Sequence, residues 1–293
     1  MAVFKRKSSL LKRSTSEIIV LCFWFVLFCV FSIMYAYPIF WAFINSFKTG
    51  REFFDSPMAL PTVWKFANYG RVFTDFRWKE YGYLDMVINS LWITGVKVFV
   101  NVLSSVLLAY PVAKFRFPGR GLLYGAVIFA NTIPIFGTGT TAYKLALGLG
   151  MVDNPFLIWL MWAGGFDFAF IVFYGTFKGI SNSYSESAAI DGASDLRVLL
   201  QIVLPQAFPA IVAIAVTQAI HVWNDYGTSM IYLRSFPNLA YGLFVFQKES
   251  NYIQDSKAIY FCAVIISMIP PAVLYGSCQK LLLTNITAGG LKG

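Results

Sequence analysis

Long apolar runs with almost no charge are the feature that most constrains this chain. A membrane-spanning helix needs roughly 20 consecutive, mostly apolar residues, and the sequence offers about six such runs. They are Ile18–Trp41, Met86–Tyr110, Gly121–Tyr143, Pro155–Phe177, Phe208–Met230 and Ala258–Leu283. The sequence therefore predicts an all-α, polytopic membrane protein of about six transmembrane helices.

The composition favours the same class of protein. Hydrophobic residues make up 58% of the 293 residues and charged residues only 13%, whereas a soluble domain carries about 25% charged residues. The formal net charge of +9 could indicate nucleic-acid binding. However, the basic residues are spread thinly between apolar runs, so membrane anchoring accounts for them better, and no nucleic-acid partner is expected.

The residues that usually carry catalysis or bind metals are sparse. Cys22, Cys29, Cys262 and Cys278 all lie in apolar runs without C-x-x-C spacing, which is typical of small buried hydrophobes. His221 is the only histidine, which excludes a multi-histidine metal centre. The chain has no G-x-x-x-x-G-K-[ST] phosphate loop, nucleophile elbow or H-E-x-x-H motif. We therefore expect a non-catalytic chain that binds no metal or cofactor.

The distribution of basic residues gives an orientation by a narrow margin. The N-terminal tail, 1–17, and the segment 114–120 are rich in lysine and arginine, which favours placing both in the cytoplasm. The first apolar run is too long for a signal peptide and is kept as an uncleaved span. An even number of spans then divides the chain into a cytoplasmic tail, a transmembrane domain (18–283) and a cytoplasmic C-terminal tail (284–293).

A polar segment, 178–207, separates the fourth and fifth runs and predicts a helix-turn-helix. Ser183 precedes Glu186 by three residues, the spacing of a capping box. Gly192 predicts the end of the first helix, and Ser194 or Asp195 predicts the cap of a second helix. Prolines at 205 and 209 then predict the return to the membrane. Caps alone would also suit an ordinary interfacial loop.

The full spacing of this segment, E-S-A-A-I-D-G-A through L-P, resembles the EAA loop of ABC-importer permeases. In that family the loop is cytoplasmic and docks onto an ATPase subunit, so the resemblance implies a coupling role for the matching positions. These are Glu186, Ser187, Ala188, Ala189, Asp191, Gly192, Ala193, Leu204 and Pro205. A carboxylate early in the first helix is also favourably placed on the helix dipole.

Other segments resemble carbohydrate-importer permeases. They are N-S-F-K-T at 45–49, A-K-F-R-F-P-G-R at 113–120 and W-N-D-Y at 223–226. The end, T-A-G-G-L-K-G at 287–293, is similar to the tail of the MalG-like half of maltose-type importers. There the tail reaches toward the ATPase dimer, which implies such contacts for Gly290, Lys292 and Gly293.

The resemblance also implies partners and a location. The partners would be a second, MalF-like permease, two ATPase subunits that bind ATP and magnesium, and an extracytoplasmic solute-binding protein. The cargo would be a saccharide, and the chain would lie in the bacterial cytoplasmic (inner) membrane. The external segments 47–85 and 231–257 are long enough to meet a binding protein.

Two stripes of polar residues in the apolar runs are candidates for a translocation path. Polar side chains in membrane spans normally face protein or water. Steps of three and four place each set on one helical face. The residues are Ser90, Thr94, Lys97, Asn101 and Ser104 in the second run, and Thr217, His221, Asn224 and Thr228 in the fifth. Interhelical hydrogen bonds that only pack the bundle are an equal alternative.

Lys97 is the sharpest of these residues, since a central charge costs about 2.5–3.5 kcal/mol on insertion scales. We expect an acidic partner, for which Asp167 is the first candidate. Alternatively, a cationic path would suit an acidic uronate glycan such as alginate. A stand-alone secondary transporter that uses Lys97 and Asp167 as an ion-coupling pair is the main alternative function. A glycan-processing enzyme would need an acid–base constellation that the sequence does not offer.

Overall fold

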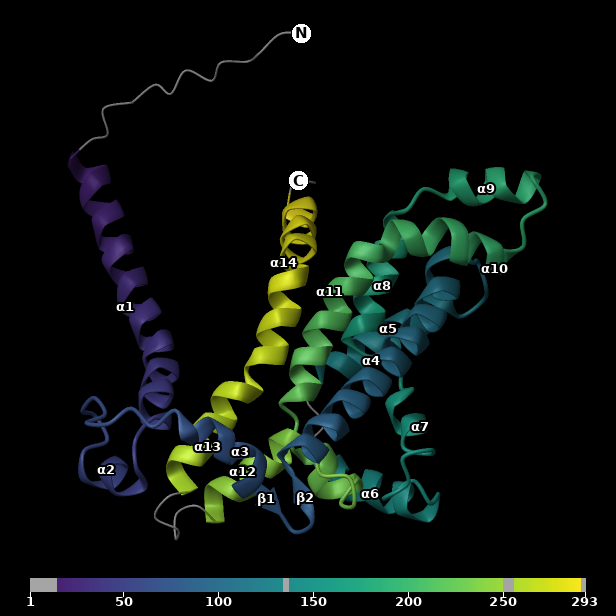
Figure 1. The fold of residues 1–293 in the computed structure, drawn as a ribbon. Helices are drawn as coiled ribbons and strands as arrows, with labels where there is room; N and C mark the ends of the chain where they lie inside the picture. The colour runs from purple at the N-terminus through teal and green to yellow at the C-terminus, as the bar shows by residue number, and fades with distance from the viewer. Residues whose placement is uncertain (1–14, 134–136, 250–255, 291–293) are drawn as a thin grey trace.

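The computed structural model describes residues 15–133, 137–249 and 256–290, and these are helical almost throughout (Figure 1). Over the described residues the only strands are β1 (Arg77–Trp78) and β2 (Tyr81–Gly82), an antiparallel hairpin. Within these described ranges, four helical runs are long and apolar enough to cross a membrane. They are α1 (Thr15–Ser46), α4 (Tyr83–Lys114), the run Asp195–Trp223 that includes α11 (Leu204–Trp223), and the run Ser256–Leu282 through α13 (Ser256–Ser267) into α14 (Ile269–Gly290). The predicted all-α, polytopic membrane architecture is confirmed.

The third and fourth apolar runs differ from the prediction, because each is divided between two helices. The third run is split between α5 (Arg120–Thr132) and α6 (Thr138–Gly148), and the fourth between α7 (Trp159–Trp162) and α8 (Phe168–Gly179). Gly137 and Gly165 lie at these divisions, with φ of 85° and 64°. Hydropathy does not detect such breaks, because glycine adds no polarity while its left-handed backbone ends a helix.

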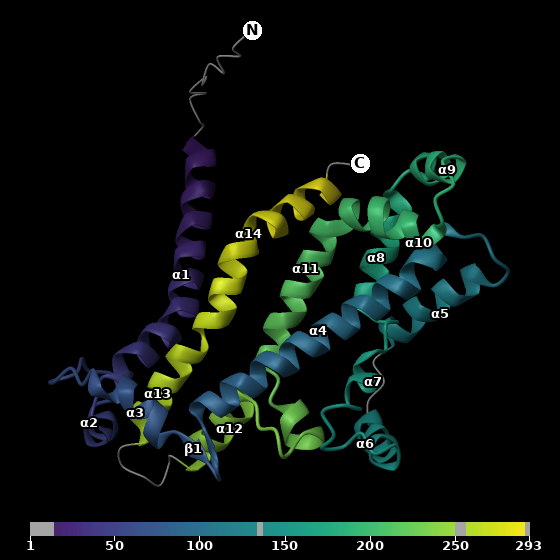
Figure 2. The ribbon, with the colours of Figure 1, turned by 45° about the vertical axis from the view of Figure 1, so that its right-hand side comes forward.

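The long helices run between two opposite ends of the molecule (Figures 1 and 2). One end holds α9 (Asn182–Ile190) and α10 (Asp195–Val198), together with the start of α1 and the end of α14. The opposite end holds the short helices α2 (Gly50–Asp55), α3 (Ala67–Asp75) and α12 (Leu239–Glu249) with the β-hairpin. The described ends of the chain thus share one end of the molecule with the Glu186 segment. The predicted tail contacts Lys292 and Gly293 lie outside the described residues.

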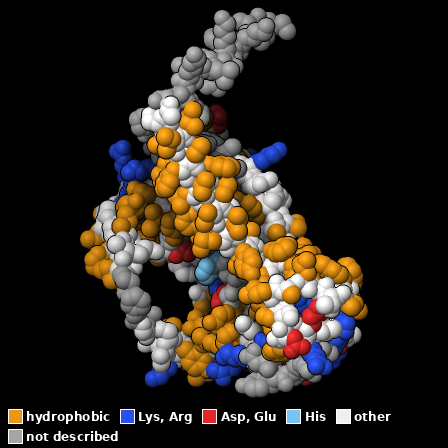
Figure 3. Space-filling view, turned by 90° about the vertical axis from the view of Figure 1, so that its left-hand side faces the viewer, with side chains coloured by type: hydrophobic (Ala, Val, Ile, Leu, Met, Phe, Trp, Pro, Cys, Tyr) orange, Lys and Arg blue, Asp and Glu red, His pale blue; other side chains and the backbone are white. Residues whose placement is uncertain are grey.

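Much of the surface is apolar. On the face shown in Figure 3, hydrophobic side chains form a broad area between the ends of the molecule. None of the most apolar 18-residue window of α1 is buried within the chain. A helix with such a surface needs lipid or another membrane protein around it, because water would leave its side chains unfavourably exposed.

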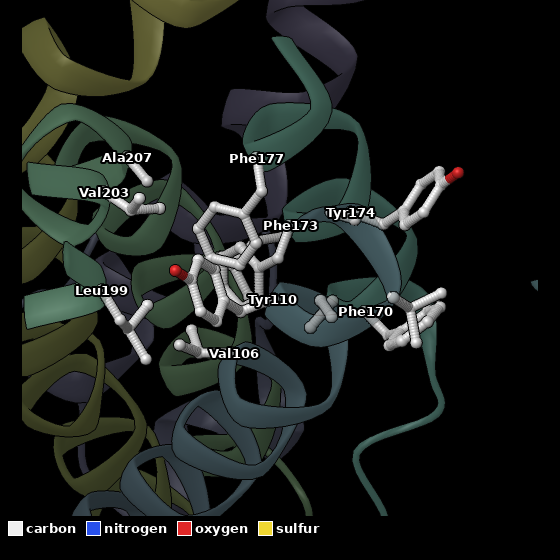
Figure 4. Packing of buried hydrophobic residues seen from close by; sticks show 14 of the residues in the cluster. Val106, Tyr110, Phe170, Phe173, Tyr174, Phe177, Leu199, Val203 and Ala207 are labelled. Carbon is white, nitrogen blue, oxygen red and sulfur yellow. The ribbon is translucent and has the colours of Figure 1, made fainter. Parts of the chain in front are cut away.

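The main hydrophobic core lies where α8 packs against α4 and the run that leads into α11 (Figure 4). Phe170, Phe173 and Phe177 follow one another at steps of three and four on α8, and all three are fully buried. Tyr110 of α4 meets Phe177 edge-on, with ring centroids 6.1 Å apart. Because helical spacing gathers these rings on one face, α8 is held against α4 along its length.

Replacement of Phe173 by alanine should destabilise this core strongly. The side chain is fully buried, so its loss leaves a cavity that typically costs about 3–5 kcal/mol. Phe168 lies on the same helix with its side chain 69% exposed, so Phe168→Ala is the matched control and should change little. Unfolding midpoints of the purified protein in detergent would measure both. Equal shifts for the two variants would contradict the packing described.

Candidate functional site: coupling helices and a polar cavity

The first helix of the predicted coupling segment is α9, and its N-cap lies two residues before the predicted one. Ser181 is the N-cap, and its hydroxyl accepts a hydrogen bond from the Ser183 backbone N–H at 3.3 Å. The predicted capping box between Ser183 and Glu186 is therefore wrong, because Ser183 already lies inside the first turn. Ser181 has the extended backbone that a cap requires (φ −60°, ψ 136°). Glu186 consequently lies in the middle of α9, with its side chain exposed to solvent.

The end of α9 is the one predicted. Gly192 has φ of 77°, and its N–H donates to the carbonyl of Ala189 at 3.1 Å. The N–H of Ala193 donates to the carbonyl of Ala188 at 2.9 Å. These two bonds form a Schellman motif, whose left-handed residue is usually glycine. The chain therefore turns sharply at Gly192 before the second helix.

Pro205 marks the predicted return to the membrane, but the helical run that begins at Asp195 continues through it to Trp223. The Ser194 hydroxyl caps α10 by accepting from the Arg197 backbone N–H at 3.4 Å. A π-helical turn (Leu199–Val203) then joins α10 to α11 without a break. Pro205 lies in the first turn of α11, where the wider preceding turn tolerates its missing N–H. Figure 2 shows the bend between α10 and α11.

Helix α10 enters the core through buried Val198, whereas α9 rests on it by small side chains and presents an outer face. Ala188 and Ala193 pack against the core, whereas Ser187, Ala189 and Asp191 are exposed. No residue of α9, which is described throughout, is fully buried. Large apolar side chains that the sequence reasoning missed are also exposed there, namely Tyr184 (54%), Ile190 (87%) and Leu196 (61%). Such residues beside polar ones are typical of a protein docking surface.

A polar cavity of about 450 Å³ lies between α4, the α7–α8 region and α11. Lys97 and Asn101 line it from α4, as expected of the predicted stripe, and His221 lines it from α11. Its other lining residues with polar or indole side chains are Trp162, Asp167 and Gln218. The cavity therefore joins parts of both predicted stripes.

Lys97 has an acidic partner, but it is Asp225 and not Asp167. The Lys97 Nζ lies 3.2 Å from Asp225 Oδ2 and 3.1 Å from Thr228 Oγ1. The two charged side chains are only 26% and 25% exposed. Thr228 and the Gly227 N–H donate to the same aspartate, at 2.6 and 2.8 Å. The ion-coupling pair required by the secondary-transporter alternative is therefore not formed in this conformation.

Asp167 instead forms hydrogen bonds that link α8 to α4 and, through Asn101, to α11. It caps α8 by accepting from the Ala169 N–H at 3.0 Å, and it accepts from Asn101 Nδ2 at 2.8 Å and Ser105 Oγ at 3.3 Å. Asn101 Oδ1 accepts in turn from Gln218 Nε2 at 2.6 Å. A continuous hydrogen-bonded chain thus crosses from α11 through α4 to α8.

The other predicted path residues lie in different environments, and none of them lines the polar cavity. Ser90 is buried away from the cavity, where its hydroxyl accepts from the Leu239 N–H at 2.8 Å. Thr94 lines a separate, apolar cavity of about 530 Å³. Thr217 and Asn224 line a further cavity with His221 and Asp225, although the Thr217 hydroxyl donates to its own helix at Ala213. Ser90 therefore fits the packing alternative, whereas Lys97 and Asn101 both line the cavity and form interhelical hydrogen bonds.

Comparison with known proteins assigns the family. Residues 102–287, more than half of the chain, match the model of the binding-protein-dependent transport system inner membrane component. The chain belongs to this family, whose members are inner-membrane transport proteins. The matched region includes the coupling helices and most of the polar cavity.

Individual relatives narrow the comparison. The chain is 27% identical to the diacetylchitobiose uptake system permease protein NgcG of Streptomyces coelicolor, over 90% of this chain and 86% of that protein. It is 26% identical to the galactooligosaccharides transport system permease protein GanQ of Bacillus subtilis, over 93% and 96%. A chain in the crystal structure of a bacterial ABC transporter that imports the acidic polysaccharide alginate is similar as well. It has a TM-score of 0.78 and 27% identity over 92% of this chain and 98% of that one.

Double-mutant cycles should distinguish the two aspartates. Lys97→Gln and Asp225→Asn should each destabilise the protein, because either change leaves the other charge unmatched. The double variant should be destabilised by less than the sum of the two single effects. A coupling free energy of about 1 kcal/mol or more is expected. Lys97→Gln with Asp167→Asn is the control and should be close to additive. Coupling of Lys97 to Asp167 instead of Asp225, measured from unfolding in detergent, would contradict the assignment.

Proposed function

We propose that this chain is the MalG-like permease subunit of an ATP-driven importer that moves an oligosaccharide across the bacterial inner membrane. The observation that carries the proposal is the exposed helix-turn-helix, α9 and α10, which has the EAA spacing and a fixed turn at Gly192. The family assignment supports the same class of transporter.

The coupling helices dock onto a partner ATPase. The chain carries no phosphate loop, so ATP and magnesium belong to two partner subunits. Glu186 is exposed and available to a basic partner residue, and Tyr184 and Ile190 supply apolar contact area beside it. The C-terminal residues Gly290, Lys292 and Gly293 add a second contact to the same partner. The ATPases can drive the permease only if their open and closed states bind this surface differently.

The end that holds α9 and α10 faces the cytoplasm. The basic residues near Lys114 and Arg120, together with Lys178 and Arg197, lie at this end, which agrees with the positive-inside rule. Both chain termini are then cytoplasmic. The opposite end, with α2, α3 and α12, meets the extracytoplasmic solute-binding protein that delivers the saccharide.

A second, MalF-like permease completes the transport path. The most apolar window of α1 is unburied within this chain, and the polar cavity is lined by residues of α4, the α7–α8 region and α11. A partner bundle would cover these surfaces and close the cavity around the cargo. Alternating access then follows when ATPase closure moves the coupling helices and opens the cavity to one side at a time.

The cargo is a saccharide, and a uronate oligomer is the specific candidate. The relatives named above include permease proteins for diacetylchitobiose and galactooligosaccharides, and the structural relative belongs to an alginate importer. The cavity offers amide, carboxylate and indole groups suited to sugar hydroxyls and ring faces. Lys97 supplies a positive charge, but a uronate must compete with Asp225 for it.

The ATPase-coupling role predicts a sharp effect at Glu186. When the chain is co-expressed with its ATPase and permease partners, Glu186→Lys should abolish co-purification of the ATPase or lower saccharide-stimulated ATP hydrolysis by at least about tenfold. Reversal of one charge at a docking surface typically has an effect of this size. Glu80→Lys is the matched control for co-purification of the ATPase, since Glu80 is also exposed but lies at the opposite end, in the β-hairpin.

Equal effects of the two charge reversals would argue against docking through α9. If the wild-type chain purifies alone and moves solute without ATP, the importer proposal fails as a whole. Co-purification of the ATPase with the wild type and the Glu80 variant, but not with the Glu186 variant, supports it.

The cargo proposal predicts opposite shifts at the ion pair. Asp225→Asn frees Lys97 and should raise the uptake of uronate oligomers relative to uncharged oligosaccharides of the same length. Lys97→Gln should lower that ratio. A change of about threefold to tenfold is expected, since an exposed or half-exposed charge contact contributes about 1 kcal/mol. Uptake of labelled oligomers into proteoliposomes measures the ratio, and identical ratios in both variants would exclude Lys97 as a uronate contact.

A further inference from the structure

Helix α8 is hydrogen-bonded to α4 at both of its own ends, to the interior of α4 at one end and to the last residue of α4 at the other. At the cavity, Asp167 accepts hydrogen bonds from Asn101 and Ser105 of α4. At the opposite end, the Lys114 Nζ donates to the Ile180 carbonyl at 2.6 Å and to Asn182 Oδ1 at 3.0 Å. The aromatic core lies between these two points. The pair is therefore built to move as one body.

The Lys114 ammonium lies where it can hold the coupling helix itself. Lys114 is the last residue of α4, where a cation suits the negative end of the helix dipole. Ile180 is the C-cap of α8, and Asn182 is the first residue of α9. One side chain thus bridges the end of α4, the end of α8 and the start of the coupling helix.

A neighbouring arginine leaves Lys114 available for this contact. Arg120 donates from Nη1 to the Phe115 carbonyl at 3.2 Å and from Nη2 to the Ala113 carbonyl at 3.4 Å. Those carbonyls lie at the end of α4, so its C-terminus is satisfied by Arg120. The lysine can then reach across to the next helix pair.

The coupling helix depends on few contacts of its own. No residue of α9 is fully buried, and its attachment to the core is through small side chains such as Ala188. One charge-assisted hydrogen bond, from Lys114 to Asn182, reaches α9 itself, and the bond to the Ile180 carbonyl holds the chain two residues earlier. Without these bonds the start of α9 would be joined to the bundle mainly by its flanking backbone and by Ala188.

We propose that Lys114 is a positioning residue that makes α9, α4 and α8 one lever, so that movement of the coupling helix reaches the polar cavity. Lys97 lies on the same helix, about 26 Å from Lys114 at 1.5 Å per residue. This inference rests on the proposed function, because the lever matters only if an ATPase moves α9.

The first test measures coupling in the complete importer, in proteoliposomes with its binding protein. Lys114→Met should keep ATPase binding and basal hydrolysis but lower the number of saccharides moved per ATP by about tenfold, the effect expected of one charge-assisted hydrogen bond. Lys114→Arg should restore most of the ratio, because arginine can donate to the same oxygens. Asn182→Ala removes only the side-chain acceptor and should give an intermediate loss. Lys178→Met is the control, since Lys178 is exposed on α8 and faces the Tyr174 ring at 5.7 Å.

The second test measures the attachment without ATP. Spin labels are placed on the exposed positions Ser187 of α9 and Leu107 of α4, through Ser187→Cys and Leu107→Cys in a chain whose native cysteines are replaced. Lys114→Met should broaden the distance distribution between the labels, and Lys178→Met should leave it unchanged.

The outcomes separate this inference from the proposed function. An unchanged distance distribution and coupling ratio in Lys114→Met overturn the inference. If Lys114→Met fails to assemble, Asn182→Ala decides, and a wild-type ratio in that variant overturns it. A wild-type importer without saccharide-stimulated hydrolysis would contradict the proposed function, while the label distances would still test the attachment.

Discussion

The rest of this structure depends on the matching of a few polar groups inside an apolar bundle. Lys97 with Asp225, and Asn101 with Asp167, join segments that are far apart in the chain. An unmatched charge in such surroundings costs several kcal/mol, so sliding or rotation of one helix against the others is strongly opposed. Apolar side chains supply the contact area, but they tolerate several registers, whereas these pairs specify one.

The long spans were predictable because their signal is local. Apolar runs of sufficient length with almost no charge leave few alternatives to a membrane helix, and four helical runs in the described part of the chain are long and apolar enough to span. The divisions near Gly137 and Gly165 were not predictable from hydropathy, which counts glycine as neutral and carries no information on φ. The partner of Lys97 was missed for another reason. Asp167 and Asp225 are both carboxylates within predicted spans, so the sequence does not distinguish them. Only the three-dimensional arrangement brings Asp225, 128 residues away, to the Lys97 ammonium.

The coupling segment was predicted well where a single residue dictates the backbone. Gly192 ends α9 and Ser194 caps α10, as their residue types indicated. Ser181 and Ser183 are chemically equivalent, so the choice of cap depended on where the preceding helix α8 ends. The exposed apolar residues Tyr184 and Ile190 could have been recognised from the sequence as docking residues. Large hydrophobic side chains in a polar helix are not part of a buried face of that helix. Their meaning depends on a partner that the chain itself does not contain.

The π-helical turn at Leu199–Val203 sets the rotation of α10 relative to α11 about the axis of one helical run. A π turn holds one residue more than an α turn, and one residue corresponds to about 100° of rotation about the helix axis. That extra residue therefore fixes which way the exposed side of α10 faces relative to the cavity side of α11. The cavity side of α11 carries Gln218 and His221. Natural variation in this family should then tolerate substitutions in the turn far better than single-residue deletions, which would point the cavity side chains toward lipid or core.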